Sequence, residues 1–442
     1  MTTNVANFLS KLEGGSIGAI LVRGAGGAFT ISLLSIAVSF ISQVLLARFM
    51  GVKSFGVFTY IVTWITLLTL PSLLGLTTGS VRFISQYYAQ EEWALLKGFL
   101  RINFTFPALA AILVGIITLC VVYFFGNFNS QDNNWNTWLF AVLFLLPFNV
   151  LVTVQASSLR GLKRAALAEA PTLLYSVGML IIVAALSMFG TNLFTSTNVM
   201  LIRSIVTAIA LFILMSFLRR SLPEQLATVE PAYQTKTWLR VSLPLLLIAG
   251  MSVVLKRTDI IMLGMFSGTT DAGVYAMASR IADFSLLSFA AVTAIAAPLI
   301  SEYFSTNQQE KLQHVVRLSA RGMFAVTALS CALIFMFPSQ ILRVFGAEFD
   351  AGSSALVILA IAHLANSFGG PVGQLLMMTG HQDDIAMILG GTVILNLCSN
   401  AALIPLHGMT GAAIATCISL MVATGISIWR VHHILGIRAS AL

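Results

Sequence analysis

Charged residues are scarce in this sequence. Only 9% of its 442 residues are Asp, Glu, Lys or Arg, whereas 58% are hydrophobic. A soluble domain carries about 25% charged residues, so this chain has too few to cover a surface that faces water. A mean hydropathy of +0.93 agrees. A large soluble catalytic domain is therefore excluded, and the composition predicts an integral membrane protein.

Cysteine is scarce, and the common catalytic patterns are missing. The four cysteines lie in apolar stretches without the spacing of a disulfide framework or a metal site: Cys120, Cys331, Cys398 and Cys417. Five histidines show no ligand spacing: His363, His381, His407, His432 and His433. There is no G-x-x-x-x-G-K-[ST] loop, carboxylate pair or Ser/His/Asp set. We expect neither an enzyme nor a bound cofactor or metal.

What the chain does contain is a series of long apolar runs. Hydropathy predicts twelve membrane spans of roughly 20 residues: 24–46, 55–79, 99–125, 137–158, 167–189, 195–218, 239–263, 272–300, 312–337, 353–378, 385–406 and 411–434. Residues 1–23 lack the features of a cleavable signal peptide, so we expect span 24–46 to act as its own insertion signal.

The longest polar stretch divides these spans into two sets of six. Residues 219–237 contain Pro223 and Pro231 and read as a linker. The predicted organisation is an N-terminal six-helix lobe at 1–218, a cytoplasmic linker at 219–237 and a C-terminal six-helix lobe at 238–442.

Lysine and arginine are unevenly divided between the two sides of the spans. With a cytoplasmic N-terminus, three of the 24 basic residues lie outside (Arg48, Lys53 and Arg343) and four lie within spans, which leaves seventeen on the cytoplasmic side. The positive-inside rule therefore predicts that both termini are cytoplasmic. The net charge of +8 gathers at helix ends near anionic headgroups, so nucleic-acid binding is not expected.

The two halves repeat each other at an offset of 216 to 220 residues. Gly56-Val57-Phe58 returns as Gly273-Val274-Tyr275, and the segment 84–88 (ISQYY) returns as 300–304 (ISEYF). Since each copy holds an even number of spans, both copies enter the bilayer from the same side. This predicts an all-α fold of two parallel six-helix lobes around a central cavity, as alternating access requires.

Charges inside the spans carry the functional prediction, because each costs from about 2.5 kcal/mol upward unless it is paired or wetted. At 1.5 Å per residue, the basic ones lie about 10 to 13 Å from the outer ends of their spans. Four cations face two carboxylates, a surplus that suits a diphosphate. The predicted diphosphate-binding residues are Arg257, Arg280, Lys256 and Arg203, and the predicted ion-coupling or orienting residues are Asp259 and Asp283.

The same charges have structural alternatives. Asp259 could pair with Arg280 or with Lys256 and so hold helices together, and Arg203 could reach outward to headgroups. Against a purely architectural role, the first copy of the repeat carries no equivalent charges: Phe40, Ser42 and Thr63 stand where the second copy has Arg257, Asp259 and Arg280.

Motifs in both halves resemble a known family. Residues 240–305 contain VSLPLLL, KRTDIIMLGMFSG, DAGVYAMASRIADF and APLISEYFS, and residues 45–90 contain LLARFMGVKSFGVFTYIVT and LGLTTGSVRFISQYYAQ. These stretches are similar to bacterial polysaccharide-biosynthesis flippases, the O-antigen and exopolysaccharide translocases. The superfamily also includes lipid II flippases and multidrug and toxic compound extrusion transporters.

The resemblance implies that the protein flips an undecaprenyl-diphosphate-linked oligosaccharide across the bacterial cytoplasmic (inner) membrane. It further implies membrane lipid as a partner, H+ or Na+ as candidate coupling ions, and the polysaccharide polymerase machinery as a candidate partner. Twelve spans rather than fourteen argue against a lipid II flippase. An ion-coupled multidrug exporter of the same architecture is the main alternative, although the cation surplus weighs against it, and a non-transporting membrane scaffold is a third.

Overall fold

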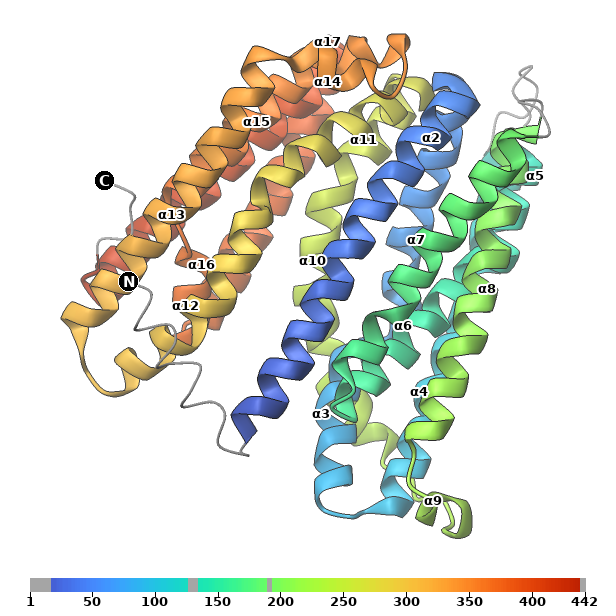
Figure 1. Ribbon diagram of the computed structural model, residues 1–442, viewed down its shortest axis with the longest axis vertical. Coiled ribbons are helices and arrows are strands. Elements are labelled where there is room, and N and C mark those ends of the chain that lie inside the picture. The colour runs from blue at the N-terminus through green and yellow to red at the C-terminus, as the bar shows by residue number, and fades with distance from the viewer. Residues whose placement is uncertain (1–16, 126–133, 189–192, 438–442) are drawn as a thin grey trace. The chain divides into compact units, whose positions relative to one another are not determined.

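The chain is helical almost throughout. The computed structural model describes residues 17–125, 134–188 and 193–437 (Figure 1). Lys11 and Arg438, two of the seventeen basic residues assigned to the cytoplasmic side, lie outside the described residues. The longer elements are α2 (Ile17–Leu73), α3 (Leu76–Ala89), α4 (Trp93–Phe125), α6 (Leu146–Gly161), α7 (Ala165–Ser187), α8 (Ser196–Ser221), α10 (Thr235–Phe266), α11 (Thr269–Asp283), α12 (Leu287–Ser305), α13 (Gln309–Met336), α15 (Ser353–Phe368) and α17 (Gln382–Leu435). Shorter ones are α5 (Trp135–Phe140), the π-turn η1 (Ala141–Leu145), α9 (Gln225–Thr228), η3 (Phe284–Leu286), α14 (Pro338–Arg343), η4 (Ala347–Gly352) and α16 (Val372–Met378).

Two of these helices are too long for a single crossing. α2 has 57 residues and α17 has 54, so each would extend about 80 Å, against about 30 Å of hydrocarbon. Each is interrupted by a glycine with positive φ, Gly51 at 69° in α2 and Gly408 at 53° in α17. Glycine adopts such angles without a Cβ clash. Each long helix therefore covers two predicted spans.

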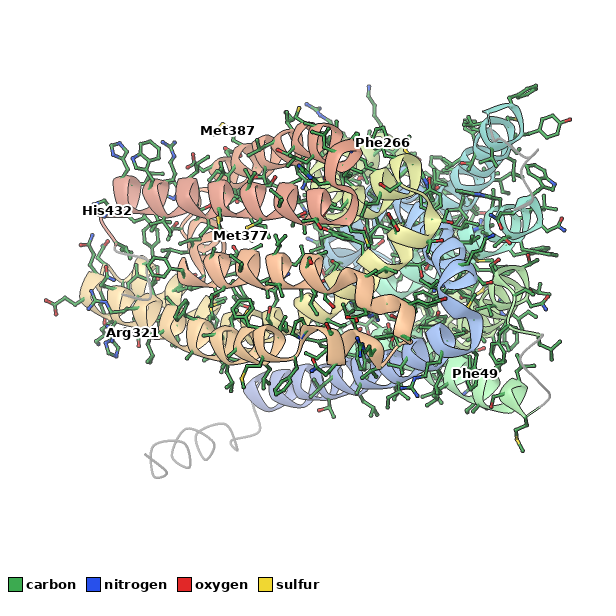
Figure 2. The ribbon with its side chains drawn as sticks, turned by 90° about the horizontal axis from the view of Figure 1, so that it is seen from above. Phe49, Phe266, Arg321, Met377, Met387 and His432 are labelled. Atoms are coloured by element: carbon green, nitrogen blue, oxygen red, sulfur yellow. The ribbon has the colours of Figure 1, made fainter. Side chains whose placement is uncertain are left out.

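Nine helices in the described part of the chain are long and apolar enough to cross a membrane. Large apolar side chains such as Phe266 and Met387, which are 52% and 66% exposed, stand out from the ribbon (Figure 2). These features confirm the predicted all-α membrane fold. Since α2 and α17 each count once among the nine and α11 and α12 are not counted, the number of twelve spans stays a prediction.

Three predicted spans are broken by turns that hydropathy does not detect. Span 55–79 is interrupted after α2, where Leu74 and Gly75 both have positive φ. Span 353–378 is interrupted after α15 at Gly370, which has φ of 63° and precedes Pro371. Span 272–300 is interrupted by η3. Hydropathy averages over side chains, whereas these breaks depend on backbone angles.

The structure divides into two compact units. The first comprises Met1–Phe49 and Trp64–Leu247, and the second comprises Met50–Thr63 and Ile248–Leu442. The polar stretch 219–237 packs within the first unit: Lys97 Nζ donates hydrogen bonds to the carbonyl oxygens of Ala227 and Val229, at 3.2 and 2.8 Å, and Ala232 N donates to Ala94 O at 2.9 Å. The three-part division at 219–237 stays a prediction.

A buried aromatic cluster holds the first turns of α10 within the first unit. Trp238 is fully buried, and its Nε1 donates a hydrogen bond to Tyr87 Oη at 2.8 Å. Its ring meets Phe99 edge-on, with the centroids 5.2 Å apart. Because the indole N–H is satisfied inside an apolar core, this tryptophan contributes its full apolar area without leaving a polar group unpaired.

The second unit brings the two copies of the repeated glycine together. Gly56 in α2 and Gly273 in α11 occupy equivalent positions of the repeat, and a Cβ built on Gly273 would lie 2.5 Å from the Gly56 Cα. A Cβ on Gly56 would meet the carbonyl of Thr269. Only glycine permits this approach of two backbones. Contact between equivalent residues is the arrangement expected next to an axis that relates two copies.

We predict that Gly56→Ala lowers the free energy of unfolding by about 1 to 3 kcal/mol, because the added methyl group must displace backbone rather than a flexible side chain. Thermal unfolding of the purified protein in detergent measures this. Gly322→Ala in α13 is the control, since a Cβ there has no atom within 4 Å, and it should leave the midpoint unchanged or raise it. Equal midpoints for the two variants would refute the close contact.

Candidate functional site

Asp259 is a carboxylate buried within the second unit. It lies on α10, is only 6% exposed, and accepts hydrogen bonds from Tyr275 Oη at 2.9 Å, from Asn400 Nδ2 at 2.7 Å and from Thr416 Oγ1. Asn400 Nδ2 also donates to Asn396 Oδ1 at 3.0 Å. We name these five residues the Asp259 cage. Residues from α10, α11 and both halves of α17 thus converge on one carboxylate.

The two amides of the cage are incompletely satisfied. Within the described residues, Asn396 Nδ2 and Asn400 Oδ1 are buried and have no hydrogen-bond partner. A buried amide atom without a partner costs about 1 to 3 kcal/mol. The Asp259 cage therefore has an unused oxygen acceptor beside a carboxylate. Carboxylate, amide and hydroxyl oxygens together are the donor set that hard cations and protons favour.

At its position on α10, the ionised form of Asp259 has a high free-energy cost. It precedes the end of α10, at Phe266, by seven residues, which places it about 10 Å along the helix from that end. Removing a carboxylate from water costs several kcal/mol, and a hydrogen bond to a charged group returns about 1.5 to 3 kcal/mol. Three neutral donors thus make an ionised Asp259 tolerable, and a proton or cation would relieve the remaining cost.

The predicted pair between Lys256 and Asp259 does not form. All hydrogen-bond partners of the Asp259 carboxylate among the described residues are neutral, and Lys256 is exposed. Arg257 is exposed as well, whereas Arg280, at the end of α11, is half-buried. Asp259 therefore forms no ion pair with Lys256.

Asp283 lies in a different environment from Asp259. Its side chain is 58% exposed, and its Oδ1 lies 3.5 Å from Nε2 of His363 on α15. His363 is buried, and its Nδ1 has no partner among the described residues. The two predicted orienting carboxylates are thus separate: one is enclosed by neutral donors and the other faces a histidine. The spacing of the histidines gave no indication of this contact, because it joins distant helices.

Arg203 belongs to the first unit. It lies on α8, and its guanidinium carbon lies 4.9 Å from the centroid of the Tyr175 ring on α7, within the range of a cation–π interaction. This contact places the side chain against α7, and the alternative of an arginine that reaches outward to headgroups stays a prediction. The grouping of Arg203 with Lys256, Arg257 and Arg280 in one layer stays a prediction.

In the first copy of the repeat, the positions equivalent to Asp259 and Arg280 carry hydroxyl side chains that donate hydrogen bonds to backbone carbonyl oxygens. Ser42, equivalent to Asp259, donates to the carbonyl oxygens of Val38 at 2.9 Å and Ser176 at 3.2 Å. Thr63, equivalent to Arg280, donates to Thr59 O at 2.8 Å. Phe58 lacks the hydroxyl of its counterpart Tyr275. The second copy therefore carries chemistry that the shared architecture does not need.

Four members of the Asp259 cage were not identified from the sequence: Tyr275, Asn396, Asn400 and Thr416. A usable signal was present, because two asparagines four residues apart in an apolar run share one helix face and polar groups within a membrane are costly. Tyr275 and Thr416 had no comparable signal. Their role depends on which helices pack against α10.

Similar proteins with curated names come from the archaeon Haloferax volcanii. The chain is 30% identical over 167 residues to the probable low-salt glycan biosynthesis flippase Agl15, a match that covers 38% of this chain and 35% of that protein. It is 29% identical over 167 residues to the probable flippase AglR, covering 37% and 35% of the two chains. The matched region thus spans about a third of each relative's length.

Solved transporters share the fold over nearly the whole chain. An inward-facing multidrug resistance MATE family transporter of the MOP superfamily aligns with a TM-score of 0.71, covering 92% of this chain and 98% of that one at 15% identity. The lipid II flippase MurJ, in an inward closed conformation, aligns with a TM-score of 0.69 over 91% and 87% at 15% identity. At such identities the likeness establishes the fold.

Family profiles match both halves of the chain. The MatE profile matches residues 244–402. The profile described as polysaccharide biosynthesis protein matches residues 21–304, more than half of the sequence and including the motifs of both repeat copies and Asp259 with Tyr275. The chain belongs to the polysaccharide biosynthesis protein family of multi-pass membrane proteins.

Proposed function

We propose that the protein is a flippase that carries a lipid-linked oligosaccharide, with an undecaprenyl-diphosphate anchor, across the cytoplasmic membrane by alternating access. Family membership over residues 21–304 carries this proposal. In it, both termini are cytoplasmic, and the polysaccharide polymerase machinery receives the product. The flippase names of the two Haloferax relatives and the fold shared with a lipid II flippase support it.

The charge arrangement of the second unit supports a diphosphate as the transported group. The hydrogen-bond donors to Asp259 are neutral side chains, so this carboxylate forms no ion pair with Lys256, and the segment carries Lys256, Arg257 and Arg280 as cations that could contact a diphosphate. Arginine offers paired donors that match phosphate oxygens, and lysine adds a compact charge. Such cations would lower the cost of moving a diphosphate through a region of low dielectric constant.

The Asp259 cage supports a second role, the coupling of transport to H+ or Na+. Its carboxylate and the free Oδ1 of Asn400 would bind a cation, or the carboxylate would take up a proton. The cage joins α10 to α11 and to both halves of α17, so occupancy would change how tightly these helices are held together. A ligand shifts a conformational equilibrium only through such a difference in affinity.

An ion-coupled multidrug exporter is the second candidate. The MatE profile match over residues 244–402 favours it. An exporter of cationic drugs needs acidic groups that face its substrate, whereas Asp259 is enclosed by its donors. Drug-susceptibility assays on cells that express the protein separate the candidates, since a flippase should leave susceptibility unchanged. If the protein were a scaffold without transport activity, Arg257→Ala and Asp259→Asn would leave export unchanged.

Arg257→Ala should reduce flipping by about 10- to 100-fold, the range expected from losing one charge-assisted contact of about 1.5 to 3 kcal/mol. The measurement uses proteoliposomes that contain a lipid-linked oligosaccharide and scores the fraction reached by a membrane-impermeant lectin. Arg317→Ala, which removes an exposed arginine from α13, is the matched control and should flip normally. Normal flipping by the Arg257 variant at equal protein level would overturn the diphosphate assignment.

Asp259→Asn should remove the dependence of flipping on the ion gradient, because the amide resembles the carboxyl in shape but carries no negative charge and does not titrate. We expect a rate at least about tenfold lower, corresponding to about 1.4 kcal/mol. Initial rates measured with imposed Na+ and pH gradients identify the ion. Thermal unfolding checks that the variant is folded. A folded variant that retains the wild-type response to both gradients would show that the Asp259 cage does not couple transport.

A further inference from the structure

A groove on the first unit combines positive charge with apolar walls. It has a volume of about 680 Å³ and is lined by the start of α4, the end of α8, and α9. Figure 1 shows α9 beside the ends of α4 and α8. α6 packs between α4 and α8 and contributes Gln155 to the lining. We name this site the basic groove. None of the residues proposed for transport lies in it.

The charge of the basic groove is unbalanced. Three basic residues line it, Lys97, Arg101 and Arg219, and the acidic residue in its lining is Glu224. The groove therefore has a formal excess of two positive charges. Lys97 Nζ is engaged by the carbonyl oxygens of Ala227 and Val229. The guanidinium groups of Arg101 and Arg219 are exposed and have no hydrogen bond or ion pair with other described residues. Two arginines on different helices are therefore available to one anion.

A buried amide in the basic groove points independently to a polar ligand. Gln155 is only 5% exposed, and within the described residues its side chain makes no hydrogen bond. Its neighbour Asn103, which also lines the groove, is satisfied: it accepts from Ser80 Oγ at 2.9 Å and donates to Ser158 Oγ at 3.0 Å. A buried amide normally has a partner, and because Gln155 lines the groove, a polar group that enters the groove could supply one.

The apolar part of the groove continues along the membrane-facing surface. Phe104 and Met215 line it, and Leu109 on α4 and Phe212 on α8, one turn further into the spans, are exposed. The charged residues lie at the helix ends, where headgroups are found, and the apolar ones lie toward the hydrocarbon. A positively charged surface followed by an apolar surface matches a lipid with an anionic headgroup and an acyl chain.

We propose that the basic groove is a binding site for an anionic membrane phospholipid. Its phosphate is held by Arg101 and Arg219, a polar headgroup or glycerol-ester atom meets Gln155, and an acyl chain lies along Phe104 and Met215. This site is separate from the proposed transport site and holds a lipid that is not transported. Basic pockets between helices at the anionic leaflet bind headgroups by the same charge complementarity.

Native mass spectrometry of the full-length protein, equilibrated with phosphatidylglycerol, tests this proposal. The double variant Arg101→Gln/Arg219→Gln should bind the lipid at least about tenfold more weakly than wild type, because two phosphate contacts are lost. Arg164→Gln/Arg220→Gln is the matched control. It removes two exposed arginines that do not line the groove and should bind normally. Equal binding by both double variants would overturn the site.

Further measurements distinguish the possible sources of the phosphate. Phosphatidylglycerol should raise the thermal unfolding midpoint of the wild type, whereas phosphatidylcholine and inorganic phosphate should not. An equal shift with inorganic phosphate would overturn the assignment to a lipid. Stronger binding of undecaprenyl diphosphate, lost in Arg101→Gln/Arg219→Gln, would instead make the groove an entry site for the transported lipid.

Gln155→Leu tests the buried amide. Since Gln155 has no protein partner among the described residues, the variant should unfold at the same or a higher temperature without lipid. It should also bind phosphatidylglycerol several-fold more weakly. A lower unfolding temperature with unchanged lipid binding would mean that the amide is structural, and would remove the polar contact from the proposal.

Discussion

The second unit depends on how a single carboxylate is kept inside a membrane protein. Asp259 would be costly in a region without water, and the fold meets that cost with one donor from α11 and one from each half of α17. These donors are neutral, so the site tolerates the charge without cancelling it. This is the physical basis on which we propose that the carboxylate binds a proton or a cation.

Glycine packing makes this arrangement possible. Gly56 and Gly273 allow α2 and α11 to approach at backbone distance, and Tyr275, two residues after Gly273, then reaches Asp259. In the first copy, Phe58 follows Gly56 at the same interval without a hydroxyl, and Ser42 bonds to backbone carbonyls. The repeat therefore keeps a glycine at the equivalent position of both copies, whereas the polar residues around Asp259 lie in the second copy.

The cations of the second unit and those of the basic groove would both bind anions by charge complementarity, but in surroundings of different polarity. In the second unit, the cations proposed to bind the diphosphate stand at positions predicted to lie within spans, where hydrogen bonds and phosphate contacts would be strong because the dielectric constant is low. In the basic groove of the first unit, positive charge lies at helix ends, where water and headgroups weaken each contact. A transported group suits the first setting, because binding must compensate for leaving water. A resident lipid suits the second, since its headgroup stays at the interface.

Composition and pattern determined the class of the protein. Low charge and apolar runs of roughly 20 residues predict membrane helices, because in lipid only helices and closed barrels satisfy the backbone and runs of this length match helices. The internal repeat indicated two related halves. The kinks at Gly51 and Gly408 and the interruptions near Gly75 and Gly370 came only from the structure, since they depend on backbone angles that hydropathy does not encode. Asp259 was singled out from the sequence as a charge within a predicted span, but its hydrogen-bond partners were not predicted. Tyr275, Asn400 and Thr416 are separated from it by 16, 141 and 157 residues, and only tertiary packing decides which distant helix supplies each hydrogen bond.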